Sequence, residues 1–331
     1  MYRRRSGLSL IETLVVVTII GVLVALLLPA VQFSREAARK TVCQNNLHQV
    51  TAAVLLHESA NQVLPSLYNG SFLPQPRSAF DEFNFHSWRT AILPQLEQSS
   101  VFASLNIALP TTTMDNQTAL NVSLAVFLCP STSNSNPTVP GVLEWNNGKI
   151  PVKVIGTAAR SDYEIIGGVH VLTRQTLPET SLEMRGVRFG VWGEPTYNIA
   201  TNASLRYRKA HLADVTDGLS NTLLIGERAG RPDYYARGEP PDPYPYRDPA
   251  AHGQGDGQAA WAISTHFLWT LYYSKQSVND TNSVGIYSFH PGGANASFAD
   301  GSVRFLKDTT SPAVLTAIGT RAGAEIVSGD Y

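Results

Sequence analysis

Two residues near the end of the chain, His290 and Asp300, are the first candidates for chemistry. A histidine and a carboxylate can act as a base and its orienting group, or bind a metal, if both converge on a cleft with a third group. The same stretch also predicts a hairpin. Asp300 and Gly301 separate two alternating apolar runs, which is typical of a two-residue type I′ turn. We therefore predict a structural role for His290, away from other titratable groups, and keep an exported hydrolase using both residues as an alternative.

Other potential ligands are sparse. Asp214, Asp217 and Asn221 carry oxygen atoms suited to calcium, but their spacing is not that of an EF-hand, so they are weak candidates. The sequence contains no nucleophile elbow, phosphate-cradling glycine loop or HExxH motif. We predict no metal, no other cofactor and no enzymatic activity.

The chain has two cysteines, Cys43 and Cys129, with no CxxC motif and no Cys/His cluster spaced for zinc. Exported chains meet an oxidising compartment, where a single disulfide would tie an N-terminal helix to a globular head. Two buried free thiols are the alternative. If the cysteines are bridged, their Cα atoms must lie within about 7 Å of each other.

The N-terminal stretch indicates where the chain sits. Residues 13–31 carry no charge, and 19 residues of helix at a rise of about 1.5 Å span roughly 28 Å, close to the hydrocarbon core of a bilayer. Residues 3–5 are all arginine, which places the N-terminus in the cytoplasm and the rest of the chain outside. The apolar run is too long for a signal peptide, and a plain anchor gives no reason for the carboxylate of Glu12.

Gly7 and Glu12 make this stretch resemble a type IV prepilin leader. In that family a peptidase cuts after the glycine and methylates the new N-terminus, here Leu8, and the acid at the fifth mature position corresponds to Glu12. Pro29 stands where pilins often carry a helix-bending proline. The resemblance implies prepilin peptidase and other pilin-like subunits as partners. A carboxylate buried among packed helices needs a cation, and the N-terminal amine of a neighbouring subunit is the candidate for Glu12.

Composition narrows the function further. The chain has 331 residues, a net charge of -1 and only 15% charged residues, so we predict no basic face and no nucleic-acid partner. The N-terminal helix should continue past the membrane, because Val42, Leu47, Val50 and Val54 form an apolar stripe at helical spacing. It should end near Asn61.

The rest of the chain predicts a β-rich head. Short β-prone runs are split by glycine and polar turns, at 152–155, 163–166, 169–173, 187–192, 204–207, 222–225 and 324–327. Short helices are expected over 87–98, broken by Pro94, over 116–126 and over 312–321. Residues 231–258 read as a long surface loop that could bind a partner. Aromatic residues in and after this loop could stack on a glycan: Tyr234, Tyr235, Tyr244, Tyr246 and Trp261.

Four separated motifs resemble one family. They are SWRTAILPQLEQ at 87–98, FLCPS at 127–131, DGLSNTLLIGE at 217–227, and the segment from His290 to Gly301, in which nine residues separate His290 from Asp300-Gly301. This set is similar to the pilin-like family abundant in Planctomycetes, a domain of unknown function (DUF1559) with a C-terminal H-x9-DG motif. The resemblance covers essentially the whole chain and implies a membrane-anchored exported protein without an established activity. One departure is Ala324, where the family often has glycine.

The predicted fold class is therefore α+β, a pilin-like long helix packed on a β-rich head. We expect a prepilin leader over 1–7, a long helix over 8–60 that spans the membrane at 13–31, and an exported head over 61–331. The protein should be a single-pass inner-membrane protein with its head in the periplasm or at the cell surface. Its predicted function is that of a pilin- or pseudopilin-like structural or interaction protein. An anchored ligand- or glycan-binding module that does not assemble into filaments is the alternative.

Overall fold

The computed structural model describes most of the N-terminal helix and much of the head. The described residues are 10–66, 68–69, 86–109, 111, 113–132, 138–140, 157–169, 190–192, 210–231, 233–238, 259–262, 268–269, 278–282 and 285–324. The strands predicted over 152–155 and 204–207 lie outside them, as do residues 170–173, 187–189 and 325–327 of three other predicted strands. Residues 191–192, which are described, form a turn rather than a strand.

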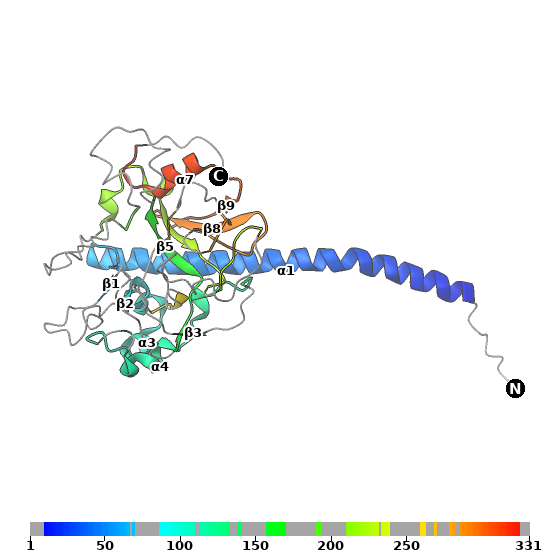
Figure 1. Ribbon diagram of the computed structural model, residues 1–331, viewed down its shortest axis with the longest axis horizontal. Coiled ribbons are helices and arrows are strands. Elements are labelled where there is room, and N and C mark those ends of the chain that lie inside the picture. Colours follow the sequence, from blue (N-terminus) through cyan, green and yellow to red (C-terminus); the bar gives the residue numbers. More distant parts are fainter. Residues whose placement is uncertain are drawn as a thin grey trace.

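A single helix, α1 (Leu10–Asn61), dominates the molecule (Figure 1). It has 52 residues and ends where predicted, because Gln62 adopts a left-handed conformation with φ of 59°. Pro29 lies inside the helix. A proline there removes one backbone hydrogen bond, and α1 curves in its N-terminal half in Figure 1. Among the described residues, α1 is the one helix long and apolar enough to cross a membrane.

The two halves of α1 have different surroundings. Residues 10–35 are exposed along their whole length and extend away from the head (Figure 1). From Cys43 onward one face is buried, and Cys43, Leu47, Val50 and Val54 are completely inaccessible to solvent. The predicted stripe was wrong in one position. Val42 is 46% exposed, and Cys43 takes its place because a step of four residues to Leu47 keeps it on the buried face.

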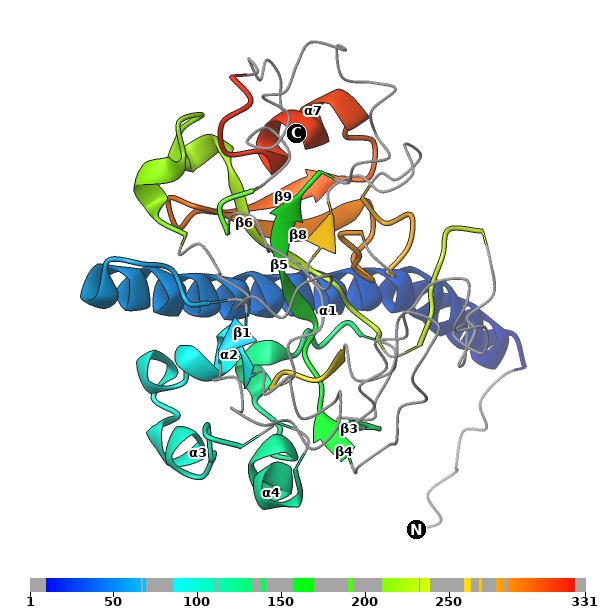
Figure 2. The ribbon, with the colours of Figure 1, turned by 60° about the vertical axis from the view of Figure 1, so that its left-hand side comes forward.

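A five-stranded sheet covers one side of the buried half of α1 (Figure 2). Its order is β7-β5-β6-β8-β9, and all pairs are antiparallel except β5 with β7. The strands are β5 (Tyr163–Gly168), β6 (Leu223–Glu227), β7 (Leu268–Trp269), β8 (Gly293–Phe298) and β9 (Val303–Lys307). Successive strand residues point to opposite faces. Ile165 packs in the cluster that contains α1, and Ile166 packs with α7 (Pro312–Gly319) on the far face.

Short elements lie on the other side of α1 in both ribbon views. They are β1 (Tyr68–Asn69), β2 (His86–Ser87), α2 (Trp88–Ala91), η1 (Pro94–Leu96), α3 (Ser99–Ala103), η2 (Met114–Asn116), α4 (Gln117–Leu120), η3 (Ala125–Phe127), β3 (Thr138–Pro140) and β4 (Thr157–Ala159). The break at Pro94 is confirmed. The single helix predicted over 116–126 was wrong, since α4 ends at Leu120 and a separate turn, η3, follows. The intervening Asn-Val-Ser sequence is a poor helix former.

The hairpin of β8 and β9 is present, but its turn differs from the prediction. Phe298 donates its N–H to the carbonyl of Ser302 at 2.9 Å and accepts from the N–H of Gly301 at 3.0 Å, so the loop has three residues. Only Gly301, with φ of 91°, is left-handed, whereas a type I′ turn needs two such residues. The Asp300 carboxylate instead accepts from the N–H and the hydroxyl of Ser302, at 2.9 and 2.7 Å.

Candidate functional site

The predicted processing and assembly residues belong to the N-terminal end of the chain. Gly7 and Leu8 lie outside the described residues, so cleavage between them stays a prediction. Glu12 and Pro29 lie in the exposed half of α1. This half carries a continuous apolar surface that the head leaves uncovered.

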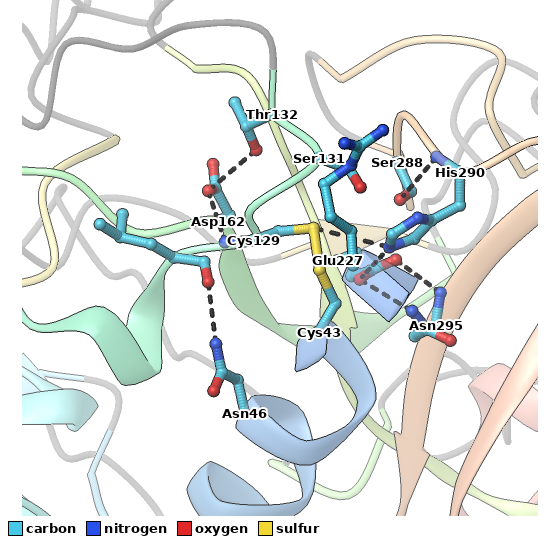
Figure 3. Close-up of a disulfide and its surroundings, with 12 residues drawn as sticks. Cys43, Asn46, Cys129, Ser131, Thr132, Asp162, Glu227, Ser288, His290 and Asn295 are labelled. Carbon is cyan, nitrogen blue, oxygen red and sulfur yellow. Dashed lines mark hydrogen bonds and ion pairs between the residues drawn. A yellow bond between two sulfur atoms is a disulfide. The ribbon is translucent and has the colours of Figure 1, made fainter. Parts of the chain in front are cut away.

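A disulfide joins α1 to the head at the point where the helix enters it (Figure 3). Cys43 and Cys129 are bonded, with their Cα atoms 5.1 Å apart, inside the limit expected for a bridge. Cys129 follows η3, and Asn46 of α1 holds the same segment by donating to the carbonyl of Leu128 at 2.9 Å. The hydroxyl of Tyr163 on β5 donates to the carbonyl of Cys43 at 3.2 Å. Both sulfur-bearing residues are buried.

His290 lies against this disulfide, and its surroundings contradict our expectation that it stands apart from titratable groups. Its Nδ1 is 2.6 Å from Oε1 of Glu36 on α1. Its Nε2 is 3.5 Å from Oε1 of Glu227, at the end of β6, and 3.5 Å from Sγ of Cys129. The loop before β8 turns the imidazole inward between α1 and the sheet. His290 is therefore a buried link between two carboxylates that the sequence separates by 191 positions, as counted from 36 to 227.

Each carboxylate has further partners. Glu36 accepts from Nε of Arg39 at 2.8 Å and from the hydroxyl of Ser131 at 2.9 Å. Glu227 accepts from the backbone N–H and the side-chain amide of Asn295 on β8, at 2.7 and 2.9 Å (Figure 3). These contacts orient both carboxylates toward His290, so the ring is held from two sides.

The two carboxylates of the cluster, those of Glu36 and Glu227, favour a positive charge on the His290 ring between them. Burial alone would lower the pKa of His290, but the hydrogen bonds and charges of Glu227 and Glu36 outweigh it and raise that pKa above its ordinary value. Burial acts in the opposite sense on Glu36, yet the hydrogen bonds from His290, Arg39 and Ser131 leave its pKa below the ordinary value. An imidazolium paired with carboxylates is the state that this geometry favours.

Another buried carboxylate, that of Asp162, holds the loop that carries Cys129 through hydrogen bonds. It accepts from the N–H of Cys129 at 2.9 Å, from the hydroxyl of Thr132 at 3.0 Å and from the N–H of Gly230 at 3.2 Å (Figure 3 shows the first two). Complete burial raises the pKa of Asp162, although Arg160 and these hydrogen bonds oppose the rise. The hydrogen bonds of Asp162 thus hold the backbone of Cys129 next to α1 without involving the sulfur atom.

The other predicted candidates do not join this cluster. His290 precedes β8 and Asp300 follows it, so the six residues of the strand, roughly 20 Å in length, separate the two members of the proposed pair. Asp217 accepts from the N–H groups of Gly323 and Ala324, at 2.6 and 2.9 Å.

The remaining weak calcium candidates also have protein partners. Asp214, in η5 (Leu212–Asp214), lies 3.7 Å from a guanidinium nitrogen of Arg321. Asn221, in η6 (Leu219–Asn221), donates its side-chain amide to the carbonyl of Asp217. Asp214 and Asp217 thus contact the segment at 321–324, and Asn221 supports Asp217, so the role of these residues as calcium ligands stays a prediction.

The aromatic surface predicted near the loop at 231–258 is only partly described. Tyr244 and Tyr246 lie outside the described residues. Trp261 was wrongly expected at the surface, because it is completely buried and stacks with Phe127 at a centroid distance of 6.2 Å. Tyr235 is half-buried and meets two other aromatic rings, those of Tyr287 and Phe289. Arg231, at the start of the predicted surface loop, is also buried.

The sequence did not indicate three members of the cluster: Glu36, Glu227 and Asn295. The position of Glu227 could have identified it. It is the last residue of the buried strand β6 and of the third family motif, and a buried carboxylate needs a partner. Glu36 resembled an ordinary exposed helix residue. Asn295 is hidden within the alternating hairpin strand.

Comparisons with known proteins agree with this architecture. The family described as "Protein of unknown function (DUF1559)" matches residues 32–313, and the prokaryotic N-terminal methylation motif matches residues 2–28. The chain is 37% identical to the type II secretion system core protein G of Pseudomonas aeruginosa over an aligned segment of 68 residues. This segment covers 20% of the chain. The chain spans 48% of that relative's length. No significant match is found among solved structures. The first match includes α1 from residue 32 onward, the disulfide, the His290 cluster and the hairpin, so the chain belongs to the DUF1559 family and carries a pilin-type N-terminal methylation motif.

Proposed function

We propose that this protein is a pilin- or pseudopilin-like subunit, cleaved between Gly7 and Leu8 by prepilin peptidase and anchored in the inner membrane by α1. The observation that carries the proposal is the contrast within α1. Residues 10–35 are exposed, and the run over 13–31 within them is uncharged and mostly apolar, whereas the face from Cys43 to Val54 is buried in the head. An uncovered apolar helix needs lipid or other helices around it. Disulfides persist in oxidising compartments, so the bridge between Cys43 and Cys129 supports a head that lies outside the cytoplasm.

Glu12 has a specific place in this proposal. It lies in the first turn of α1, in the uncovered half. When such helices pack side by side, its carboxylate would enter a medium where an unpaired charge is costly. The methylated amine of Leu8 on a neighbouring subunit would pair with it. Glu12 therefore acts in assembly, and the head does not need it to fold.

Mass spectrometry of the mature N-terminus tests the proposal. We expect a chain that begins with N-methylated Leu8, and Gly7→Val should retain the leader because a bulky residue blocks the cleavage position. The Glu12→Gln variant should be cleaved normally. When cells are treated with a chemical crosslinker, it should give fewer crosslinked subunits than the wild type does. An intact Met1 in the mature wild-type protein, or cleavage near Ala30, would refute the proposal.

One observation favours a second candidate, a glycan-binding head. The rings of Tyr235, Tyr287 and Phe289 form a half-buried cluster, with Tyr235 and Phe289 in a T-shaped contact at 4.8 Å. Aromatic faces at a surface are suited to stacking on sugar rings. A glycan array should then show binding by the wild type that Tyr287→Ala abolishes. Binding that survives this substitution would remove the cluster from consideration.

A further inference from the structure

We propose that the dithiol form of this protein binds one Zn²⁺ ion through Cys43, Cys129, His290 and Glu227, so that the disulfide and the metal are alternative closures of one buried site. In the described part of the chain, these four residues each place one potential ligand atom within 4.8 Å of the other three. All four are buried. This inference is independent of the processing and assembly proposed above.

The distances agree with a tetrahedral zinc site. Bond lengths of about 2.3 Å to sulfur and about 2.0–2.2 Å to nitrogen and oxygen give separations of about 3.4–3.6 Å between a nitrogen ligand and a neighbouring sulfur or oxygen ligand. Nε2 of His290 lies 3.5 Å from Sγ of Cys129 and 3.5 Å from Oε1 of Glu227. These two edges of the tetrahedron already have the required length. Reduction frees the two sulfur atoms to separate by rotation of their side chains.

The surroundings orient the ligands as they do in known zinc sites. Metal-binding histidines commonly donate their second ring N–H to a carboxylate, which fixes the tautomer and the ring orientation. Here Nδ1 of His290 meets Glu36 at 2.6 Å, so Nε2 is the nitrogen that faces the sulfur atoms. Asn295 holds the Glu227 carboxylate by two hydrogen bonds. Glu36 and Asn295 are thus positioning residues for the two ligands that are not cysteines.

The donor set selects the metal. Two thiolates, one imidazole and one carboxylate suit Zn²⁺, whereas Ca²⁺ and Mg²⁺ prefer an all-oxygen set. The reduced state requires a dithiol reductant, which transfers two electrons and two protons to the disulfide. The S–S bond breaks, two thiols form, and the reductant becomes a disulfide. Zinc then displaces the two thiol protons and the proton that His290 carries on Nε2.

Metal titration of the full-length chain in detergent micelles tests the proposal. The chain is reduced with a dithiol, freed of it anaerobically, and titrated with Zn²⁺ against a chromophoric chelator. We expect one Zn²⁺ per reduced chain and none per oxidised chain at the same chelator concentration. Co²⁺ in place of Zn²⁺ should give a thiolate charge-transfer band in the near ultraviolet, and Cys129→Ser should weaken it. Bound Zn²⁺ should protect both cysteines from alkylation.

Variants separate this site from adventitious binding. Glu36→Gln should lower zinc affinity by about 10–100-fold, as expected for a partner behind a ligand. His290→Ala and Glu227→Gln should lower it further, since each removes a ligand. His86→Gln is the matched control, because it alters another buried histidine and should leave affinity unchanged.

The proposal is overturned if reduced and oxidised chains bind Zn²⁺ equally, or if His290→Ala and Glu227→Gln bind it like the wild type. If reduction unfolds the head, its near-ultraviolet circular dichroism spectrum is measured before and after zinc is added. Zinc should then restore the native spectrum of the reduced wild type, and failure to restore it refutes the proposal as well.

Discussion

Removing the disulfide should strongly destabilise the head. The change is Cys43→Ala with Cys129→Ala, which deletes the bridge and leaves no thiol for metal. The bridged residues are 86 positions apart. For a loop of this length the chain-entropy relation gives about 15 cal/mol/K, or roughly 4.6 kcal/mol at 25 °C, near the top of the range seen for native disulfides. We therefore expect the free energy of unfolding to fall by about 4–5 kcal/mol.

Chemical denaturation in detergent micelles measures this loss. The fluorescence of Trp88, Trp192 and Trp261 reports on the head, because all three are buried in the cluster that packs on α1. Reduced wild type in the presence of a chelator should unfold like the double variant, which separates the bridge from the alanine substitutions themselves. A loss below about 1 kcal/mol would refute the entropy argument and would mean that contacts other than the bridge already order the unfolded loop.

Three further predictions concern the head. Arg89→Met should cost about 3–5 kcal/mol by leaving Glu164, which it meets at 2.9 Å, as an uncompensated buried charge, and a loss under 1 kcal/mol in urea denaturation would contradict this. Burial lowers the pKa of His86 below its ordinary value of 6.5, so the unfolded chain binds the proton first and the stability of the fold should decline as pH falls through 6.5. In melting temperatures measured across this pH range, His86→Gln should reduce that decline. An unchanged slope would contradict the prediction. Gly293→Ala should cost about 1–3 kcal/mol, since the added methyl would lie 2.0 Å from a backbone oxygen of the facing strand, whereas Gly21→Ala, with nothing within 4 Å, should melt like the wild type.

The long helix was predictable because its signals are local. An uncharged run, a helical stripe and a stop near Asn61 can each be read within a few turns of the sequence. Val42 was misassigned because an apolar residue at the edge of a stripe has the same pattern whether the head reaches it or not. The hairpin was likewise predictable from Asp300-Gly301, but the loop length was not, since a turn of two or three residues tolerates the same pair.

The buried cluster was not predictable, because its members come from four distant segments. Glu36 and Cys43 share one face of α1, but no sequence spacing links them to Cys129, Glu227 or His290. The five residues meet only when β6 and β8 pair and both pack on α1. The same limit applies to Trp261. An aromatic residue beside a polar, proline-rich stretch looks like a surface residue until the fold places it against Phe127. A search for buried acids near strand ends would have drawn attention to Glu227.

The part of α1 where the helix enters the head makes three different kinds of polar or covalent contact with the head. Glu36, Lys40 and Cys43 follow one another at steps of four and three, so they share one face of the helix. Glu36 bonds to His290, Lys40 stacks on the ring of Phe305 at 3.1 Å, and Cys43 is bridged to Cys129.

A force applied through the exposed half of α1, residues 10–35, would therefore reach the head first at this junction, before it reaches the apolar contacts nearer Asn61. The disulfide is the covalent part of the junction, while the imidazole and the cation–π contact fix its orientation. Exchanging the disulfide for a metal would preserve the covalent path from Cys43 to Cys129 through coordinate bonds. It would also keep His290 and Glu227 facing the same point. In either state the junction would remain closed.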